Sequence, residues 1–252
     1  MSDAIYGGYA PIYLASGQAW VGLRSWSTLA GWLSGAGWRG QAAADLGCGS
    51  GEVAAVLAQA GYMVTAVDRS AAMVALARGR VGHPQITWQL ADLADWQSQQ
   101  SFDLVVSFYD TLNYLTDINT LASLAKRVGA LLRPGGIFAF DLNTPNEYAT
   151  WDERSTVTAD SEDLFVYNML NFSPESQLAE GRIVWFARTS AGWSRGEESH
   201  VQRAHSDDEV VGAIAGAGLR LQARLDPAGA PADPAAATRI LYVAQRPDAQ
   251  PT

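Results

Sequence analysis

Three acids and a glycine-rich turn are the residues of this sequence best suited to bind a charged small ligand. The turn, GCGSG at residues 47–51, has glycines at alternate positions, which let the backbone approach a ligand because no Cβ intervenes. Asp45 precedes the turn, Asp68 ends the next apolar run, and Asp92 follows the third. A pyrophosphate would be repelled by Asp45, whereas an ammonium group would be attracted to it. The pattern predicts a cationic, phosphate-free adenosine cofactor, with Asp68 on the ribose hydroxyls and Asp92 on the adenine amino group.

A histidine in a polar run near residue 200 is the best candidate for a general base. Strand alternation would put Glu198, His200 and Gln202 on one face. An unperturbed imidazole titrates near neutrality, and Glu198 could orient or charge it. The alternative interpretation is a polar network that only ties this segment to the rest of the protein.

Further polar residues follow the apolar run at 102–107. Asp110, Asn113 and Tyr114 could contact a substrate or the cofactor, or could cap the next helix. Arg239 could meet an acidic substrate, although we favour a pair between Arg239 and a carboxylate of an inserted lobe. The candidate substrate-binding residues are Asn113, Tyr114, Arg203 and Arg239.

Alternating strands and helices over residues 41–141 must position these side chains. The expected strands are 42–46, 63–67, 85–90, 102–107 and 137–141, and the expected helices are 52–60, 71–80 and 117–132. The strand at 102–107 is almost continuously apolar, as buried parallel strands are. The pattern predicts an α/β fold with a doubly wound parallel sheet and a ligand crevice at the carboxyl ends of its strands.

The segments on either side of this core are expected to cover the crevice. Residues 1–40 are predicted to be a helical lid with a helix over 16–33; Tyr6, Tyr9 and Tyr13 could close over the cofactor, or the helix could only cover a sheet edge. Residues 142–205 are predicted to be an antiparallel β lobe that binds substrate, or alternatively one that only packs or dimerises.

The remaining residues, 206–247, are predicted to be a helix at 207–217 and a strand pair that completes the core sheet. The expected strands of the lobe are 164–172, 182–189 and 193–202, and those of the final pair are 219–225 and 238–245.

Composition narrows the range of partners. The 252 residues carry a formal net charge of -9, which argues against a nucleic-acid partner because phosphate binding needs a basic surface. The single cysteine, Cys48, permits no disulfide within the chain, and we interpret it as a small apolar filler of the turn. There is no signal peptide pattern and no stretch long enough to span a membrane. We expect a cytoplasmic monomer or homodimer.

Taken together, the motifs resemble class I S-adenosylmethionine-dependent methyltransferases over about residues 9–247. The matching runs are AADLGCGSGEVAAVLAQAGYMVTAVDRSAAMVALAR, ITWQLADLADW, FDLVVSFYDTLNYL and LLRPGGIFAFDLN. The sequence is closer still to a mostly uncharacterised bacterial subgroup with a DSLNYL-like motif, here residues 110–115, although it has His205 where an aromatic is common and lacks the acid before Arg239. The resemblance implies a Rossmann-like seven-stranded sheet with the final strand antiparallel.

The resemblance also implies the cofactor, S-adenosyl-L-methionine, its product S-adenosyl-L-homocysteine, and residue roles. Asp45 and the turn would hold the methionine end, Asp68 the ribose, and Asp92 with Leu93 the adenine edge. The expected cofactor-binding residues are Tyr9, Tyr13, Asp45, Gly47, Cys48, Gly49, Gly51, Asp68, Arg69, Met73, Asp92, Leu93, Phe108 and Tyr109. The expected catalytic residues are His200, Glu198 and Asp110, and no metal is expected.

The predicted function is methyl transfer to nitrogen or oxygen of a small-molecule acceptor by in-line displacement, which depends mainly on orientation. A nucleic-acid methyltransferase is the first alternative, but the run SFYD at residues 107–110 lacks the Asp/Asn-Pro-Pro-Tyr/Phe motif typical of amino-base methylation. We also consider a nicotinamide-dependent oxidoreductase and a non-catalytic protein that binds adenosylmethionine.

Overall fold

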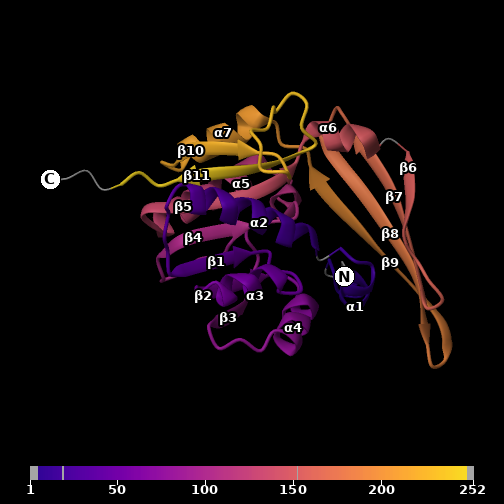
Figure 1. The fold of residues 1–252 in the computed structure, drawn as a ribbon. Helices are drawn as coiled ribbons and strands as arrows, with labels where there is room; N and C mark the ends of the chain where they lie inside the picture. Colours follow the sequence, from indigo (N-terminus) through magenta and orange to yellow (C-terminus); the bar gives the residue numbers. More distant parts are fainter. Residues whose placement is uncertain (1–4, 19, 152, 249–252) are drawn as a thin grey trace.

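A computed structural model describes residues 5–18, 20–151 and 153–248, and its main feature is a seven-stranded sheet with helices on both faces (Figure 1). In spatial order the strands are β10 (Arg220–Leu225), β11 (Arg239–Gln245), β5 (Leu132–Asn143), β4 (Phe102–Ser107), β1 (Ala42–Leu46), β2 (Met63–Asp68) and β3 (Ile86–Leu90). Strands β1 to β5 are parallel, and β11 is antiparallel to both of its neighbours. The predicted Rossmann-like sheet with an antiparallel final strand is confirmed.

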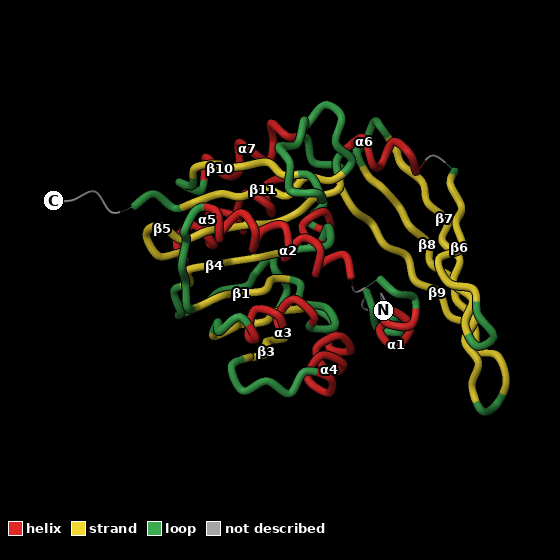
Figure 2. Tube along the Cα trace, viewed as in Figure 1, coloured by secondary structure: helices red, strands yellow, loops and turns green. Residues whose placement is uncertain are grey.

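Helices lie on both faces of the core sheet (Figure 2). They enclose two separate apolar clusters, one on each face. The helices α2 (Trp20–Gly35) and α3 (Glu52–Gln59) cover one face, and α5 (Ile118–Leu131) and α7 (Asp207–Gly216) cover the other. The helix α4 (Ala71–Arg80) contacts β2 and β3. Because both faces are covered, the open edge for a ligand lies at the ends of the strands.

Serine side chains in the local sequence determine where two of the helices begin. The side chain of Ser70 accepts the N–H of Met73 at the start of α4. Ser206 and Glu209 form a reciprocal capping box at the start of α7. These caps satisfy backbone N–H groups that the helix itself leaves unpaired, and so they fix where each helix begins.

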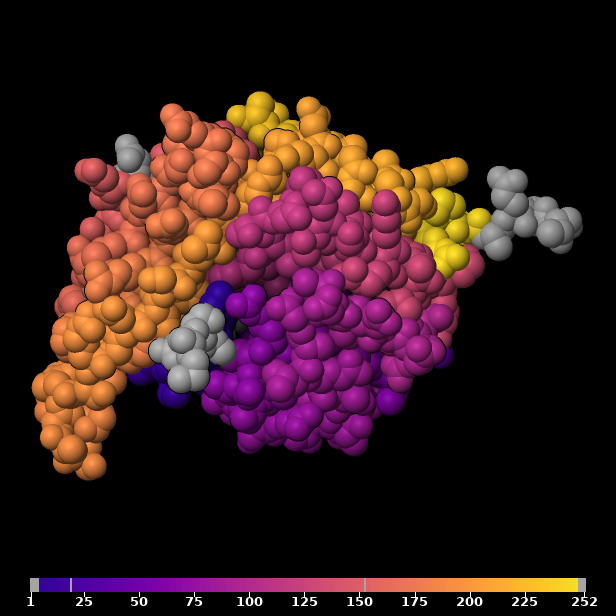
Figure 3. Space-filling view, turned by 180° about the vertical axis from the view of Figure 1, so that it is seen from behind, coloured from indigo at the N-terminus to yellow at the C-terminus, as the bar shows by residue number. Residues whose placement is uncertain are grey.

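A four-stranded antiparallel sheet, which we call the lobe, stands beside the carboxyl ends of the core strands (Figure 1). Its strands are β6 (Arg154–Asp160), β7 (Leu164–Ser173), β8 (Leu178–Thr189) and β9 (Gly192–Arg203), and α6 (Pro145–Tyr148) and the 3-10 helix η2 (Ala149–Trp151) lead into it. The strand β6 was not predicted, because most of its residues are exposed and it has no apolar alternation. From behind, the tip of the lobe projects beyond the core and the indigo N-terminal residues lie between the two (Figure 3).

The N-terminal region differs from the prediction in one respect. The helix expected over 16–33 is α2, which begins only at Trp20, and a further helix that was not predicted, α1 (Ala10–Ala15), precedes a turn that contains Gly17 at φ 75°. Among the residues described, we find no helix with both the length and the apolar character needed to cross a membrane.

Candidate functional site

A cavity, which we call the first cavity, lies at the carboxyl ends of β1, β2 and β4, where the strand order reverses. Most of the residues predicted to bind the cofactor line it: Tyr13, Asp45, Gly47, Cys48, Gly49, Asp68, Arg69, Met73, Asp92, Leu93, Phe108 and Tyr109. The fold therefore brings Asp68 and Asp92, which follow later strands, next to Asp45 and the glycine turn.

Asp45 carries the clearest sign of a missing partner. It is 2% exposed, and its Oδ2 atom has no hydrogen-bond partner among the described residues. Burial raises the pKa of this carboxyl to about 7, and the charge of Asp68 adds to the rise. A buried polar atom without a partner costs free energy, and a cationic group in the first cavity would remove that cost. Asp45 therefore fits the ammonium group of a bound adenosylmethionine.

Asp68 is held by the backbone on both sides. Its Oδ2 atom accepts the N–H of Gly49 and its Oδ1 atom accepts the N–H of Ser70, both at 2.8 Å. Burial raises the pKa of Asp68, and these two hydrogen bonds oppose the rise. Each carboxylate oxygen keeps a lone pair for a ligand hydroxyl. Asp68 thus ties the glycine turn to the start of α4 and could still bind a ribose.

The rim of the first cavity is polar and its inner wall is apolar. Arg69 Nη1 lies 3.8 Å from Asp92 Oδ2, and both side chains are about half exposed. Met73 and Leu93 are buried behind them. An adenine could therefore pack against Met73 and Leu93 and hydrogen-bond to the carboxylate of Asp92.

Gly51 and Tyr9 were predicted to bind the cofactor but do not line the first cavity. Gly51 has φ 90° at the start of α3, and a Cβ there would lie 2.7 Å from the ring of Trp88, so the glycine serves the turn and its packing. Tyr9 is fully buried, and its ring packs 5.3 Å from that of Trp185. Both residues support the cavity from outside.

The sequence interpretation missed several residues of the first cavity, including Glu52 and Thr111. Glu52 accepts the hydroxyl of Ser50 at 2.5 Å and pairs with Arg80 at 2.6 Å. Thr111 is so close to the turn that a Cβ at Gly47 would lie 2.2 Å from its Cγ2 atom. Gly47 at φ 77° is therefore needed for close packing of the turn as well as for its conformation.

The chain before α1, residues 5–9, crosses from the lobe to the first cavity, and we call it the N-terminal segment. Glu198 on β9 accepts the N–H of Tyr6 at 2.8 Å, of Gly8 at 2.8 Å and of Tyr9 at 2.9 Å. Burial opposes the ionisation of Glu198, but its neighbour His200 and these three N–H groups lower its pKa below the usual value. Glu198, expected to be catalytic, lines neither cavity and instead holds the N-terminal segment in place.

A second cavity of about 500 Å³ lies between the core and the lobe. It is lined from α2, β5 and β11 on one side and from the lobe on the other. Three residues line both cavities: Tyr6, Tyr109 and Tyr114. The two cavities therefore share a wall made of tyrosine side chains.

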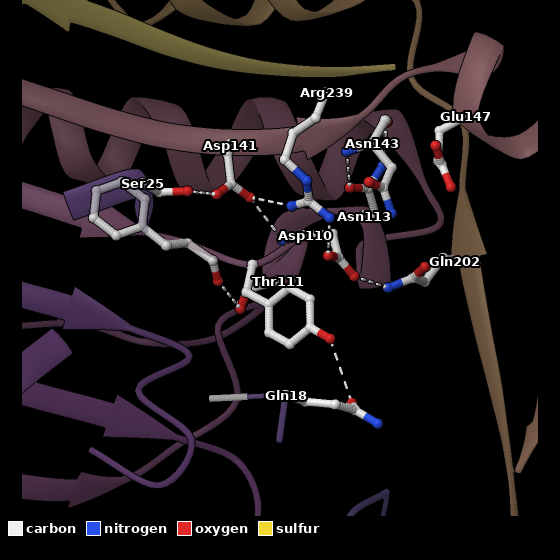
Figure 4. Close-up of polar contacts among 12 residues, drawn as sticks. Gln18, Ser25, Asp110, Thr111, Asn113, Asp141, Asn143, Glu147, Gln202 and Arg239 are labelled. Carbon is white, nitrogen blue, oxygen red and sulfur yellow. Dashed lines mark hydrogen bonds and ion pairs between the residues drawn. The ribbon is translucent and has the colours of Figure 1, made fainter. Parts of the chain in front are cut away.

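Arg239 sits at the centre of a charged cluster beside the second cavity (Figure 4). Its guanidinium donates to Asp110 at 2.7 Å and to Asp141 at 2.8 Å; Asp141 also accepts from Ser25, and Asp110 accepts from Gln202 at 2.6 Å. Burial opposes the charge of Arg239, but the two carboxylates raise its pKa. The expected pair with a lobe carboxylate is therefore wrong, because both partners of Arg239 come from the core. The Asp110 carboxylate is already engaged, so it is not a free base.

The backbone after β4 turns sharply at this cluster. Tyr109 has φ 60° and Asp110 has φ 49°, a left-handed conformation that is costly outside glycine and often found at functional sites. The turn lets the Asp110 N–H reach Asp141 Oδ1 at 2.8 Å. Tyr109 consequently lies in the shared wall, and Asp110 caps no helix with its side chain.

His200 lines the second cavity and is 6% exposed. Its Nδ1 atom lies 2.9 Å from the hydroxyl of Tyr114, which lies 3.1 Å from the hydroxyl of Tyr6. Its Nε2 atom lies 3.6 Å from Glu198 Oε2 and has no hydrogen-bond partner among the described residues. The histidine expected as a base is therefore linked to the shared wall by two phenol hydroxyls.

Asn113 and Arg203 were expected to bind substrate but line neither cavity. Asn113, on the 3-10 helix η1 (Thr111–Tyr114), donates to the carbonyls of Asn143 and Arg203 at 3.1 and 2.8 Å. The Arg203 guanidinium pairs with Glu209 at 2.7 Å. Their polar groups are used inside the protein, where they fasten η1 and so position Tyr114.

Within residues 5–18, 20–151 and 153–248, no group of three or more metal-ligand side chains comes together.

Relatives named as methyltransferases are similar to this chain in sequence. Residues 43–136 match a family model described as a methyltransferase domain. The chain is 29% identical over 170 residues to a putative methyltransferase of Geobacillus sp. (strain WCH70), which is 66% of this chain and 68% of the relative. It is also 29% identical over 182 residues to the putative methyltransferase YqeM of Bacillus subtilis (strain 168), covering 70% of this chain and 72% of the relative.

Solved structures with the same fold cover nearly the whole chain. An S-adenosylmethionine-dependent methyltransferase from Clostridium acetobutylicum ATCC 824 superposes with a TM-score of 0.84 at 22% identity, over 97% of this chain and 100% of that one. The amino pentose methyltransferase CalS10 from Micromonospora echinaspora, solved with S-adenosylmethionine, gives 0.75 at 19% identity, over 98% and 99%. At these identities the likeness shows that the lobe and the core sheet together form a known architecture.

Proposed function

We propose that the chain is an S-adenosylmethionine-dependent methyltransferase of class I and that it methylates a nitrogen or oxygen of a small-molecule acceptor held in the second cavity. The observation that carries the proposal is the wall shared by the two cavities. A methyl group moves in line from donor to acceptor, so the two ligands must meet where their sites adjoin. Tyr6, Tyr109 and Tyr114 mark that place.

The residues of the first cavity suit the cofactor chemically. Asp45 would bind the ammonium group, Asp68 the ribose hydroxyls, and Asp92 with Leu93 the adenine. Gly49, at φ 50°, has open space where a Cβ would stand, so its backbone can come close to the methionine end. When bound, adenosylmethionine supplies an electrophilic methyl group on a sulfonium centre.

The second cavity favours a small acceptor that is neutral or cationic. Its volume of about 500 Å³ lies in the range of small-molecule sites, roughly 300–1,000 Å³. Four carboxylates and two guanidinium groups line it, and the Arg239 guanidinium is already paired with two of those carboxylates. A phosphate-rich acceptor such as a nucleic acid would be repelled. Amines and hydroxyls are better matched, and the side chains of Gln202, Ser25 and Tyr114 offer polar contacts to them.

The protein contributes mainly by orientation and by exclusion of water. Fixing two reactants in line can lower the barrier by roughly 7–11 kcal/mol. The N-terminal segment covers the first cavity, and the lobe closes the second. The cluster around Arg239 holds η1 and β5 rigidly beside the reacting position.

A labelling screen tests the proposed function. Purified protein is incubated with adenosylmethionine carrying a labelled methyl group and with a bacterial metabolite extract, and labelled products are identified by mass spectrometry. We expect a labelled small amine or alcohol, and no label with Asp68→Ala, which removes both carboxylate oxygens that face the ribose. Label found only in RNA, or tight cofactor binding without any labelled product, would contradict the proposal.

A further inference from the structure

We propose that Tyr6, Tyr114 and His200 form a proton relay that takes the proton lost by the acceptor, an inference that rests on the function proposed above. Methyl transfer to a protonated amine or to a hydroxyl releases one proton from the acceptor. The proton must leave from the shared wall, where Tyr6 and Tyr114 lie and His200 does not. His200 lines only the second cavity, behind the two phenols.

The three groups form a continuous line of hydrogen bonds. The Tyr6 hydroxyl is 3.1 Å from the Tyr114 hydroxyl, which is 2.9 Å from His200 Nδ1. The rings also pack, with centroids 5.0 Å apart for Tyr6 and His200 and 5.9 Å apart for Tyr114 and His200. Three elements distant in sequence, the N-terminal segment, η1 and β9, supply one residue each, so the line exists only in the folded chain.

The direction of the hydrogen bonds follows from the surroundings of the imidazole. On its own strand Glu198 faces Nε2 at 3.6 Å, and from η1 and the N-terminal segment the two phenols face it. The pKa of both phenols is raised by burial first, so they stay protonated and serve as carriers. Asp110, the carboxylate at the start of η1, is paired with Arg239. A proton on Nε2 therefore faces Glu198, and Nδ1 accepts from Tyr114.

The proton transfer balances without a further reactant. The acceptor N–H or O–H bond breaks as Tyr6 gains the proton; Tyr6 passes its own proton to Tyr114, and Tyr114 passes its own to Nδ1. Both phenols end neutral, and His200 ends as an imidazolium with its Nε2–H facing the Glu198 carboxylate. Water takes the proton after the product leaves.

The first test reads the imidazole directly and needs no acceptor. The chain has three histidines, so ¹⁵N NMR of histidine-labelled protein resolves them, with His83→Gln and His205→Gln as assignment variants. In its neutral form His200 should carry its proton on Nε2, and Tyr114→Phe should move the Nδ1 signal toward that of an unbonded nitrogen. Tyr242→Phe, which removes a buried hydroxyl bonded to Asp207 far from the cavities, is the matched control and should leave the signal unchanged. A proton on Nδ1, or a signal unchanged by Tyr114→Phe, overturns the relay.

The second test follows single turnovers across pH with the acceptor found by the labelling screen. Tyr114→Phe should slow methyl transfer at neutral pH by about 10²-fold or more, with less loss at high pH and an unchanged adenosylmethionine Kd. An unchanged rate and pH profile in Tyr114→Phe refutes the relay alone. A wild-type protein that methylates no small molecule refutes the proposed function, and the relay falls with it.

Discussion

Replacing Asp45 by asparagine is expected to stabilise the ligand-free protein while weakening its binding of adenosylmethionine. Asparagine keeps the shape of the side chain and removes its charge. In the folded chain that charge is buried, and the Oδ2 atom has no partner among the described residues. The same carboxylate would be the partner of the ligand ammonium group. Stability and binding should therefore change in opposite directions.

The size of the gain follows from the pKa of Asp45, which burial and then Asp68 raise from 3.8 to about 7. A rise of about 3 pH units corresponds to about 4 kcal/mol, at 1.36 kcal/mol per unit. The folded state holds this proton more tightly than the unfolded chain. The contribution of Asp45 to stability is therefore full below about pH 4, declines as pH rises, and is lost above about pH 7. The free energy of unfolding of Asp45→Asn should exceed that of the wild type by about 4 kcal/mol at pH 8 and by less than half of that at pH 5.

Urea unfolding of the ligand-free protein at pH 5 and pH 8 measures the gain, and calorimetry measures binding. The adenosylmethionine Kd should rise about 100-fold, or roughly 2.7 kcal/mol, because a buried charge-assisted contact is lost. Asp92→Asn is the matched control: this acid lines the same cavity but is about half exposed, so its neutralisation should not stabilise the protein. An increase in the free energy of unfolding that is equal at both pH values, or absent at pH 8, would refute the reasoning.

Three further substitutions test the surrounding structure. Glu198→Gln should speed amide exchange of residues 6–9 at least tenfold, since about 1.4 kcal/mol of lost bonding gives that factor; unchanged protection by mass spectrometry would argue against the anchor. Arg239→Met should lower the free energy of unfolding by about 3–5 kcal/mol because Asp110 and Asp141 lose their buried partner; a loss under about 1 kcal/mol in urea would contradict this. Gly51→Ala should cost about 2 kcal/mol at φ 90°, and a neutral effect on thermal unfolding would count against a strained turn.

The core could be predicted from the sequence because its signals are local. The strands at 42–46 and 102–107 were placed with the bounds that the structure has, since a buried parallel strand is a continuous apolar run followed by a turn. The acids at the ends of these strands share the edge of one sheet, so their meeting follows from topology alone. For this reason most of the expected cofactor residues line one cavity.

The remainder of the candidate site depends on contacts between distant parts of the chain. Glu198 lies 192 positions from Tyr6, and Asp110 lies 129 positions from Arg239. The spacing of apolar residues does not predict such pairs, because each of these polar side chains could equally have been exposed to solvent. The exposed strand β6 shows the same limit, since it lacks the apolar alternation by which a strand is recognised. The sequence therefore predicted the lining of the first cavity better than that of the second.

The position of Tyr6 has a consequence for the order of events in a catalytic cycle. Tyr6 belongs to the walls of both cavities and is carried by the N-terminal segment that Glu198 holds. If that segment moves away to admit the donor, the second cavity loses the part of its wall that Tyr6 forms. The donor should therefore bind first and the product S-adenosylhomocysteine should leave last, so that S-adenosylhomocysteine competes with the donor and not with the acceptor. The short N-terminal segment would thus determine the order in which the ligands bind and the products leave.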